Sequence, residues 1–298
     1  ALGQTLLYSA QRLGPLRLVP LLLAGLAAGA YMGHDYLPTV GQQYSSRDIF
    51  SAWNSLRGPS EALMVHGMKA RSGAYYAEGE VRTGASIEDV ATYLASDERR
   101  WAAFSREQLS TIDARFRARS GKHLFVANAS NARTVLVSNE EVRGEPDRNP
   151  LAAAVRSTLP AEIDQRTNIR FGDKVELVGY DLELPREGSV GPGERLTITW
   201  YWRVLERVPG GYQIFVHIDG HGGRINGDHQ PVSGAYPTSM WQPGDIIEDR
   251  QTLDVPGHLT TGEYTIHIGL WSGPNRMPIT VGERDDGNRA IAGRLQIR

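Results

Sequence analysis

The feature that most constrains the fold is the alternating segment RLTITWYWRVL at residues 195–205. Apolar side chains occupy every second position from Leu196 to Val204, which is typical of a strand with one buried face. The same period marks three further segments, at 175–184, 212–219 and 263–272, and shorter candidates lie at 246–253, 277–281 and 291–297. Turns rich in Gly and Pro separate them. Residues 166–298 are therefore predicted to form an antiparallel β-sandwich of immunoglobulin or jelly-roll type.

A smaller α/β domain is expected over residues 36–165. It should begin with a polar linker, 36–60, that contains one short helix around Ile49 to Trp53. Two S-x-x-D/Q boxes, at 86–89 and 105–108, predict the starts of two helices. Strand signals fall at 63–70, 75–77, 101–104, 123–129 and 134–139, and a further short helix at 151–157. The chain as a whole is thus expected to be α+β.

An uncharged segment, LVPLLLAGLAAGAYMG at 18–33, predicts a single transmembrane helix within residues 1–35. Its sixteen residues span about 24 Å, so Leu13 to Leu16 must extend it to cross a bilayer core of about 30 Å. Gly25 and Gly29 form a small-xxx-small pair, a candidate helix-packing face. An amphipathic stretch with leucines at helical spacing precedes the span.

Orientation and processing follow from the flanking residues. Arg12 and Arg17 precede the segment, which places the N-terminus in the bacterial cytoplasm and residues 36–298 in the periplasm. A cleaved secretory signal, with Ala28 to Ala30 as the A-x-A-like site, is the alternative. We expect an uncleaved anchor in the inner membrane.

Composition excludes several classes of protein. The net charge is −2 and 22% of residues are charged, evenly spread, so nucleic acid is not an expected partner. Cysteine is absent, which excludes disulfides, cysteine-ligated zinc and thiol nucleophiles. No G-x-G-x-x-G or G-x-x-x-x-G-K-[ST] motif occurs. No cofactor is expected.

One group of residues has metal-like chemistry. His217, Asp219 and His221 are spaced as alternate side chains of a strand, and Asp228 and His229 follow. Imidazole and carboxylate groups are ligands for zinc or manganese. Asp219-Gly220 and Gly222-Gly223 also mark a hairpin tip, where polar residues are ordinary. The hairpin interpretation is preferred, so metal binding is only a weak hypothesis.

Four aromatic residues, Tyr201, Tyr236, Trp241 and Trp271, are candidates for an exposed face. Tyr201 and Trp271 lie on the alternate phase of their strands. Such a face could be an interface with the α/β domain or a partner, or a platform that stacks against sugars. We expect an interface.

Residues 47–298 resemble a known extracytoplasmic region. The matching motifs are FGDK-x-x-L-x-GYDL at 171–182, FVHI at 215–218, YPTS-x-W-x-PG at 236–244 and the GEYTIHIGLW strand. They are similar to the C-terminal region of bacterial multi-spanning glycosyltransferases that use polyprenyl-phosphate sugars. The resemblance implies the fold and not the activity. Those enzymes carry their catalytic carboxylates within a bundle of transmembrane helices, and this chain has one predicted span, so no catalytic residue is transferred.

The sequence predicts no enzyme. We expect a non-catalytic periplasmic subunit that stabilises a larger integral membrane complex and contacts the lipid bilayer through its anchor. An energy-transducing assembly, such as a photosynthetic reaction-centre–antenna complex, is the concrete candidate. The alternative is a carbohydrate- or envelope-binding module related to the glycosyltransferase accessory region.

Overall fold

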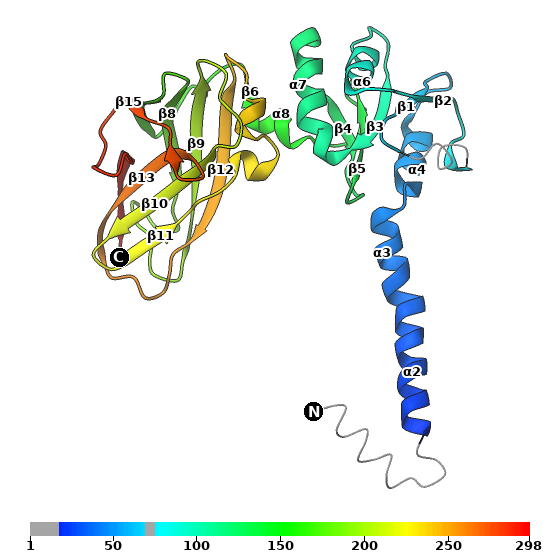
Figure 1. The fold of residues 1–298 in the computed structure, drawn as a ribbon, viewed down its shortest axis with the longest axis horizontal. Helices are drawn as coiled ribbons and strands as arrows, with labels where there is room; N and C mark the ends of the chain where they lie inside the picture. Colours follow the sequence, from blue (N-terminus) through cyan, green and yellow to red (C-terminus); the bar gives the residue numbers. More distant parts are fainter. Residues whose placement is uncertain (1–17, 69–74) are drawn as a thin grey trace. The chain divides into compact units, whose positions relative to one another are not determined.

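The computed structural model describes residues 18–68 and 75–298. It is a mixed α/β protein, mostly β, with three sheets (Figure 1). The chain divides into two compact units, the first comprising residues up to Leu109 with Phe125–Arg148, and the second Ser110–Leu124 with Asn149–Arg298. The chain therefore passes three times between them. These units differ from the predicted domains, because residues 110–124 and 149–165 group with the β-rich unit.

The N-terminal described segment is a helical rod made of α2 (Val19–Tyr31), a π-helical turn η2 (Met32–Tyr36) and α3 (Leu37–Tyr44) (Figure 1). Pro20 lies in the first turn, where its missing N–H costs nothing. No helix within residues 18–68 and 75–298 is both long and apolar enough to cross a membrane. The predicted extension at Leu13 to Leu16, both arginines and the amphipathic stretch lie outside the described residues. Residues 37–44 are helical, so the predicted linker is wrong there.

The first unit contains a five-stranded mixed sheet in the order β2-β1-β3-β5-β4. Strand β1 pairs in parallel with β2 and β3, and β5 pairs antiparallel with β3 and β4. The bounds are β1 Leu63–Val65, β2 Val81–Thr83, β3 Trp101–Ser105, β4 Phe125–Asn128 and β5 Thr134–Ser138.

Helix α4 (Arg47–Leu56) covers one face of this sheet. Its Ile49, Phe50 and Trp53 pack with Leu63 and Trp101 in one buried cluster. Helix α6 (Ile87–Leu94) begins at Ser86, whose side chain accepts from the Asp89 backbone N–H in the predicted capping box.

Two local predictions in this region are wrong. Tyr75 and Tyr76 are helical, not extended. Ser105 makes no side-chain cap, because a 3₁₀ turn, η3 (Arg106–Gln108), separates it from helix α7 (Leu109–Ser120).

The second unit is β-sandwich-like, with two antiparallel sheets in two layers (Figure 1). One sheet has the order β15-β7-β8-β9-β12-β6. The other has the order β11-β10-β13-β14, with β16 also paired to β13. The first sheet comprises β6 Val155–Arg156, β7 Gln165–Phe171, β8 Val175–Glu183, β9 Arg195–Val204, β12 Ile246–Asp254 and β15 Ile279–Val281. The second comprises β10 Gln213–Gly220, β11 Gly223–Asn226, β13 Gly262–Ser272, β14 Asn275–Arg276 and β16 Ala290–Ile297.

The alternation predicted for β9 is confirmed on its apolar phase, since Ile198, Trp200 and Trp202 are completely buried. The opposite face of β9 is not open to solvent at Tyr201. Tyr201 packs with Ile163 and Val178 in a small second cluster, and is itself buried. Helix α8 (Pro150–Ala154) begins at Asn149, whose side chain accepts from the Leu151 N–H.

A buried ionic network joins α7 to the start of α8 within this unit. Asp113 is fully buried and accepts from the Leu124 N–H at 2.9 Å, from Asn149 Nδ2 at 3.2 Å and from His123 Nδ1 at 2.8 Å. His123 Nε2 faces the Val155 carbonyl at 2.7 Å. Both ring nitrogens thus face oxygen atoms, an arrangement that favours the imidazolium form of His123. Burial lowers the pKa of His123, but Asp113 raises it by more, and the pKa ends above its ordinary value.

Candidate functional site

The candidate site lies on the sheet that contains β10 and β13, on the face that points away from the sandwich core. Strand β10 alternates, so Ile214 and Val216 are fully buried in the core while Phe215 and His217 lie on the opposite face. Across the ladder, Phe215 is paired with Gly269 of β13 and Gln213 with Trp271. One row of side chains from two neighbouring strands therefore faces the same space.

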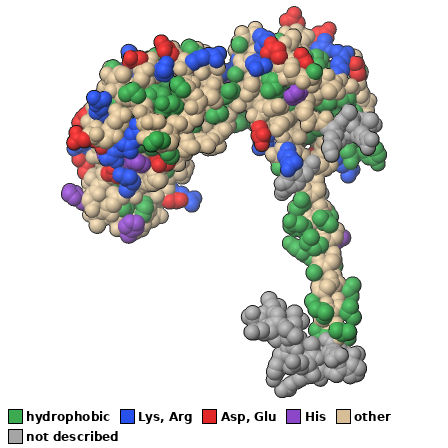
Figure 2. All heavy atoms as spheres, viewed as in Figure 1, with side chains coloured by type: hydrophobic (Ala, Val, Ile, Leu, Met, Phe, Trp, Pro, Cys, Tyr) green, Lys and Arg blue, Asp and Glu red, His purple; other side chains and the backbone are tan. Residues whose placement is uncertain are grey.

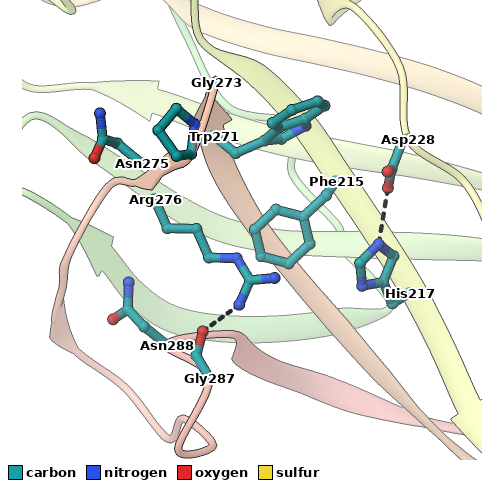
Figure 3. A pocket seen from close by; sticks show the side chains of 10 residues that line it. Phe215, His217, Asp228, Trp271, Gly273, Asn275, Arg276, Gly287 and Asn288 are labelled. Atoms are coloured by element: carbon teal, nitrogen blue, oxygen red, sulfur yellow. Dashed lines mark hydrogen bonds and ion pairs between the residues drawn. The ribbon is translucent and has the colours of Figure 1, made fainter.

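This space is a cavity of about 560 Å³ between β10, β13, β14 and the Gly287-Asn288 turn (Figure 3). Its size falls within the range of roughly 300–1,000 Å³ that is usual for small-ligand sites. The residues that define its chemistry are Phe215, His217, Asp228, Trp271, Asn275 and Arg276.

Phe215 forms the floor of the pocket. Its ring lies over Gly269, where a Cβ atom would come within 2.5 Å of the ring atom Cε1. The guanidinium carbon of Arg276 lies 5.0 Å from the ring centroid, within the range of a cation–π contact. Arg276 also donates to the Gly287 carbonyl (Figure 3). The floor is thus fixed from both sides of the ring.

His217 and Asp228 form a polar pair at one end of the pocket. His217 Nε2 lies 3.2 Å from Asp228 Oδ1, and His217 Nδ1 has no partner (Figure 3). Burial lowers the pKa of His217 and outweighs the raising effect of Asp228. The ring is therefore neutral near pH 7, with its proton on Nε2 and an acceptor at Nδ1.

Trp271 forms a wall of the pocket. It is the single tryptophan of the six that is not buried; Trp53, Trp101, Trp200, Trp202 and Trp241 are at most 1% exposed. Its indole Nε1–H has no hydrogen-bond partner in the structure. The indole N–H groups of Trp53, Trp200 and Trp202 also lack partners, so this feature does not set Trp271 apart.

A compact set of charges lies beside the pocket on the same sheet. Asp219 pairs with Arg224 at 2.5 Å and with Arg289 at 2.6 Å. Burial raises the pKa of Asp219, but the two arginines lower it by more. His267 lies within 3.5 Å of Asp219, and burial together with Arg289 lowers its pKa. These charges compensate one another and leave no free cation or anion in this cluster.

The structure does not gather the metal candidates. His217 pairs with Asp228, Asp219 with arginines, and His229 with Asp249 at 2.8 Å; His221 is exposed in the β10–β11 turn. Over residues 18–68 and 75–298, no group of three or more His, Asp or Glu residues is placed to hold a metal ion.

His229 instead belongs to a structural pair. Its Nδ1 lies 2.7 Å from the Gly227 carbonyl, and its Nε2 faces the fully buried Asp249. Burial lowers the pKa of His229, but Asp249 raises it by more. Asp249 also accepts from the Val232 N–H at 2.9 Å. Val232 and Ser233 both adopt left-handed backbone angles, φ 52° in each, which Asp249 helps to hold.

Three of the four aromatic candidates are not exposed. Tyr201 donates to Asp181 at 2.6 Å, and the Trp241 indole donates to the Tyr236 carbonyl at 3.0 Å. Tyr236 is fully buried and donates to Asp245 at 2.7 Å, while Arg117 of α7 donates to its hydroxyl at 2.9 Å. Their proposed place on an exposed face is wrong, because the YPTSMWQPGD loop folds on itself around Tyr236 and Trp241, and Ile163 packs against Tyr201. Only Trp271 reaches a surface cavity.

Gly25 and Gly29 lie in α2 with nothing within 4 Å of an added Cβ atom. No described element packs against either residue. The prediction that they form a helix-packing face stays a prediction.

Sequence reasoning missed Phe215, Asn275 and Arg276. The signal for Phe215 was available, since it stands on the phase opposite to Ile214, Val216 and Ile218. Asn275 and Arg276 form the two-residue strand β14, which pairs with Trp271 and Ser272. No pattern in so short a strand identifies it.

The chain matches no protein-family model and no curated protein sequence. The C-terminal domain of Wzt superposes on 46% of this chain and 82% of its own length, with TM-score 0.33 and 12% identity. The CARDB domain of the PF1109 protein from Pyrococcus furiosus, in complex with di-metal ions, covers 46% of this chain and all of its own, with TM-score 0.23 and 17% identity. Likenesses this weak carry no argument about function.

Proposed function

We propose that this protein is a non-catalytic, membrane-anchored subunit that stabilises a larger membrane protein complex. One observation carries the proposal: α2 is rich in leucine, yet none of its residues is buried. In this proposal the anchor lies in a bacterial inner membrane and both folded units are periplasmic.

The exposure of α2 is unusual for so apolar a helix. Leu21, Leu22 and Leu26 are 66%, 63% and 70% exposed. Figure 2 shows hydrophobic side chains along this rod, whereas charges of both signs are interspersed over the folded units. Each buried leucine gains about 1.5–3 kcal/mol from leaving water, so a helix of this kind needs lipid or protein around it.

The residues that follow α2 suit a membrane boundary. Tyr31 and Tyr36 are exposed and lie with their ring centroids 6.5 Å apart, and His34 and Asp35 come between them. Tyrosines are enriched where a helix leaves the hydrocarbon core. Helix α4, which packs into the first unit, begins at Arg47. Few residues therefore separate the proposed bilayer from the folded protein, as a subunit held close to its partners requires.

Two of the described histidines have structural roles. The imidazoles of His123 and His229 each have both ring nitrogens engaged, by Asp113 and Val155 or by Asp249 and Gly227. A general acid or base needs a free position that faces the substrate. These pairs hold segments together and leave no such position.

The test is to identify what surrounds the protein in its native membrane. Membranes are solubilised in a mild detergent, the chain is captured through a C-terminal tag, and associated proteins are identified by mass spectrometry. We expect a stoichiometric complex of integral membrane subunits. Near-infrared absorption of bound pigment would identify the reaction-centre–antenna candidate. A chain recovered alone and monodisperse would contradict the scaffolding role.

A further inference from the structure

We propose that the pocket between β10, β13 and β14 binds a neutral pyranose sugar, with Trp271 as the stacking wall. The site is separate from the apolar helix α2 and from its proposed anchoring role. The inference therefore stands independently of the scaffolding function.

The walls of the pocket have the shape and chemistry to hold a sugar ring. Trp271 presents part of its indole to the pocket as an aromatic side, and Phe215, which is 2% exposed and packed against Gly269 and Arg276, supports the floor beneath (Figure 3). The C–H faces of a pyranose ring pack against such flat rings. Large, rigid aromatic groups provide contact area at a low cost in conformational entropy.

Hydrogen-bond donors and acceptors are mixed around the aromatic rings of the pocket. Asp228 offers carboxylate oxygens, Arg276 offers guanidinium N–H groups, and Asn275 offers both an oxygen and an NH₂ group. All three side chains belong to exposed residues. A hydroxyl group both donates and accepts, so a ring that carries several hydroxyls matches this set.

The charges of the pocket residues also limit the ligand. Arg276 and Asp228 carry opposite charges, and burial keeps His217 neutral. Asp228 would repel a strongly anionic ligand, and Arg276 would repel a cationic one. The pocket therefore favours a polar ligand without net charge.

The experiment uses Trp271 as its own reporter. The full-length protein is labelled with 5-fluorotryptophan, which gives one ¹⁹F resonance for each of six tryptophans. Trp271→Phe assigns the resonance from the pocket. The protein is kept in a polyoxyethylene ether detergent, because the headgroup of an alkyl maltoside is itself a sugar. The probes are maltotriose, a mannotriose and N,N′-diacetylchitobiose.

We expect at least one probe to shift the Trp271 resonance saturably while the five buried tryptophans stay unchanged. Asn275→Ala and Arg276→Ala should each lower the affinity for that probe at least about tenfold, which is the effect of losing one good polar contact. The matched control is Arg195→Ala. The Arg195 side chain is 75% exposed and lies on the other sheet of the sandwich, so this variant should bind the probe with wild-type affinity.

Two results would overturn the proposal. One is the absence of any Trp271 shift with all three probes up to roughly 50 mM, far above a Kd of about 1 mM. The other is a shift that both pocket variants retain at wild-type affinity. Unchanged resonances of the five buried tryptophans in each variant establish that the fold is intact.

Discussion

Gly269 lies directly beneath the ring of Phe215, and the ring occupies the space that a Cβ atom at position 269 would need. Gly269→Ala should therefore displace Phe215 from the pocket floor. Overpacking of this kind costs about 1–3 kcal/mol, which a urea unfolding curve measures. Gly257→Ala is the control, since nothing lies within 4 Å of a Cβ atom there. Equal stability of the two variants would refute the packing relationship.

The hydroxyl of Tyr236 connects Arg117 to Asp245, which is itself 6% exposed. Tyr236→Phe removes the donor to Asp245 Oδ2 and should destabilise the second unit by about 1–3 kcal/mol. Tyr75→Phe serves as the control, because Tyr75 is 81% exposed. Thermal unfolding distinguishes them. A Tyr236→Phe protein as stable as the control would show that Arg117 and Gln242 satisfy Asp245 without the hydroxyl.

His123 should stabilise the protein most at acidic pH. Its pKa is raised in the folded state, so its contribution is fully present below its ordinary value of 6.5 and is lost as pH rises through the folded pKa. His123→Gln should therefore destabilise the protein more at about pH 5.5 than at about pH 8. The measurement is the free energy of urea unfolding at both pH values. A loss that is equal at both would exclude the imidazolium.

His217 should behave in the opposite way. Its pKa is lowered by burial, so protonation opposes folding and the wild-type protein loses stability as pH falls below 6.5. His217→Gln removes that penalty. Its destabilising effect should accordingly be smaller at about pH 5.5 than at about pH 8. Because the substitution is the same as at His123, a common trend in both variants would contradict the two assignments.

Charge placed in α2 should release the protein from membranes. Leu22→Arg combined with Leu26→Arg puts two cations at positions 63% and 70% exposed, at about 2.5–3.5 kcal/mol each in a bilayer centre. We expect the double variant to shift to the soluble fraction after cell lysis. Ser51→Arg, on the exposed side of α4, should stay with the membrane. Retention of the double variant at wild-type levels would argue against lipid contact by α2.

Local signals in the sequence predicted local structure well. The box at Ser86 caps its helix because the two partners are three residues apart and need nothing else. The apolar phase of β9 is buried as its period predicts. The opposite face of β9 was mispredicted as exposed at Tyr201. Ile163 packs against this residue, and it lies in an irregular segment whose sequence has no helical or strand periodicity.

The candidate site was harder to predict, because it joins distant segments. Phe215 and Trp271 meet through the β10–β13 ladder, and Asn288 reaches the pocket from a turn. A sequence pattern identifies the strands but not which strands are neighbours. The aromatic residues of YPTSMWQPGD were mispredicted for a related reason. Tyr236 bonds to Asp245 within this segment, but also to Arg117, which is distant in the chain.

The three passages of the chain between its two compact units limit how the protein can be divided. The segment Ser110–Leu124 belongs to the second unit, yet it is flanked on both sides by segments of the first. A single cut between Arg148 and Asn149 would deprive the β-rich unit of α7, with its Asp113 and Arg117. Neither unit corresponds to a continuous gene fragment. Truncation at one site therefore cannot separate them.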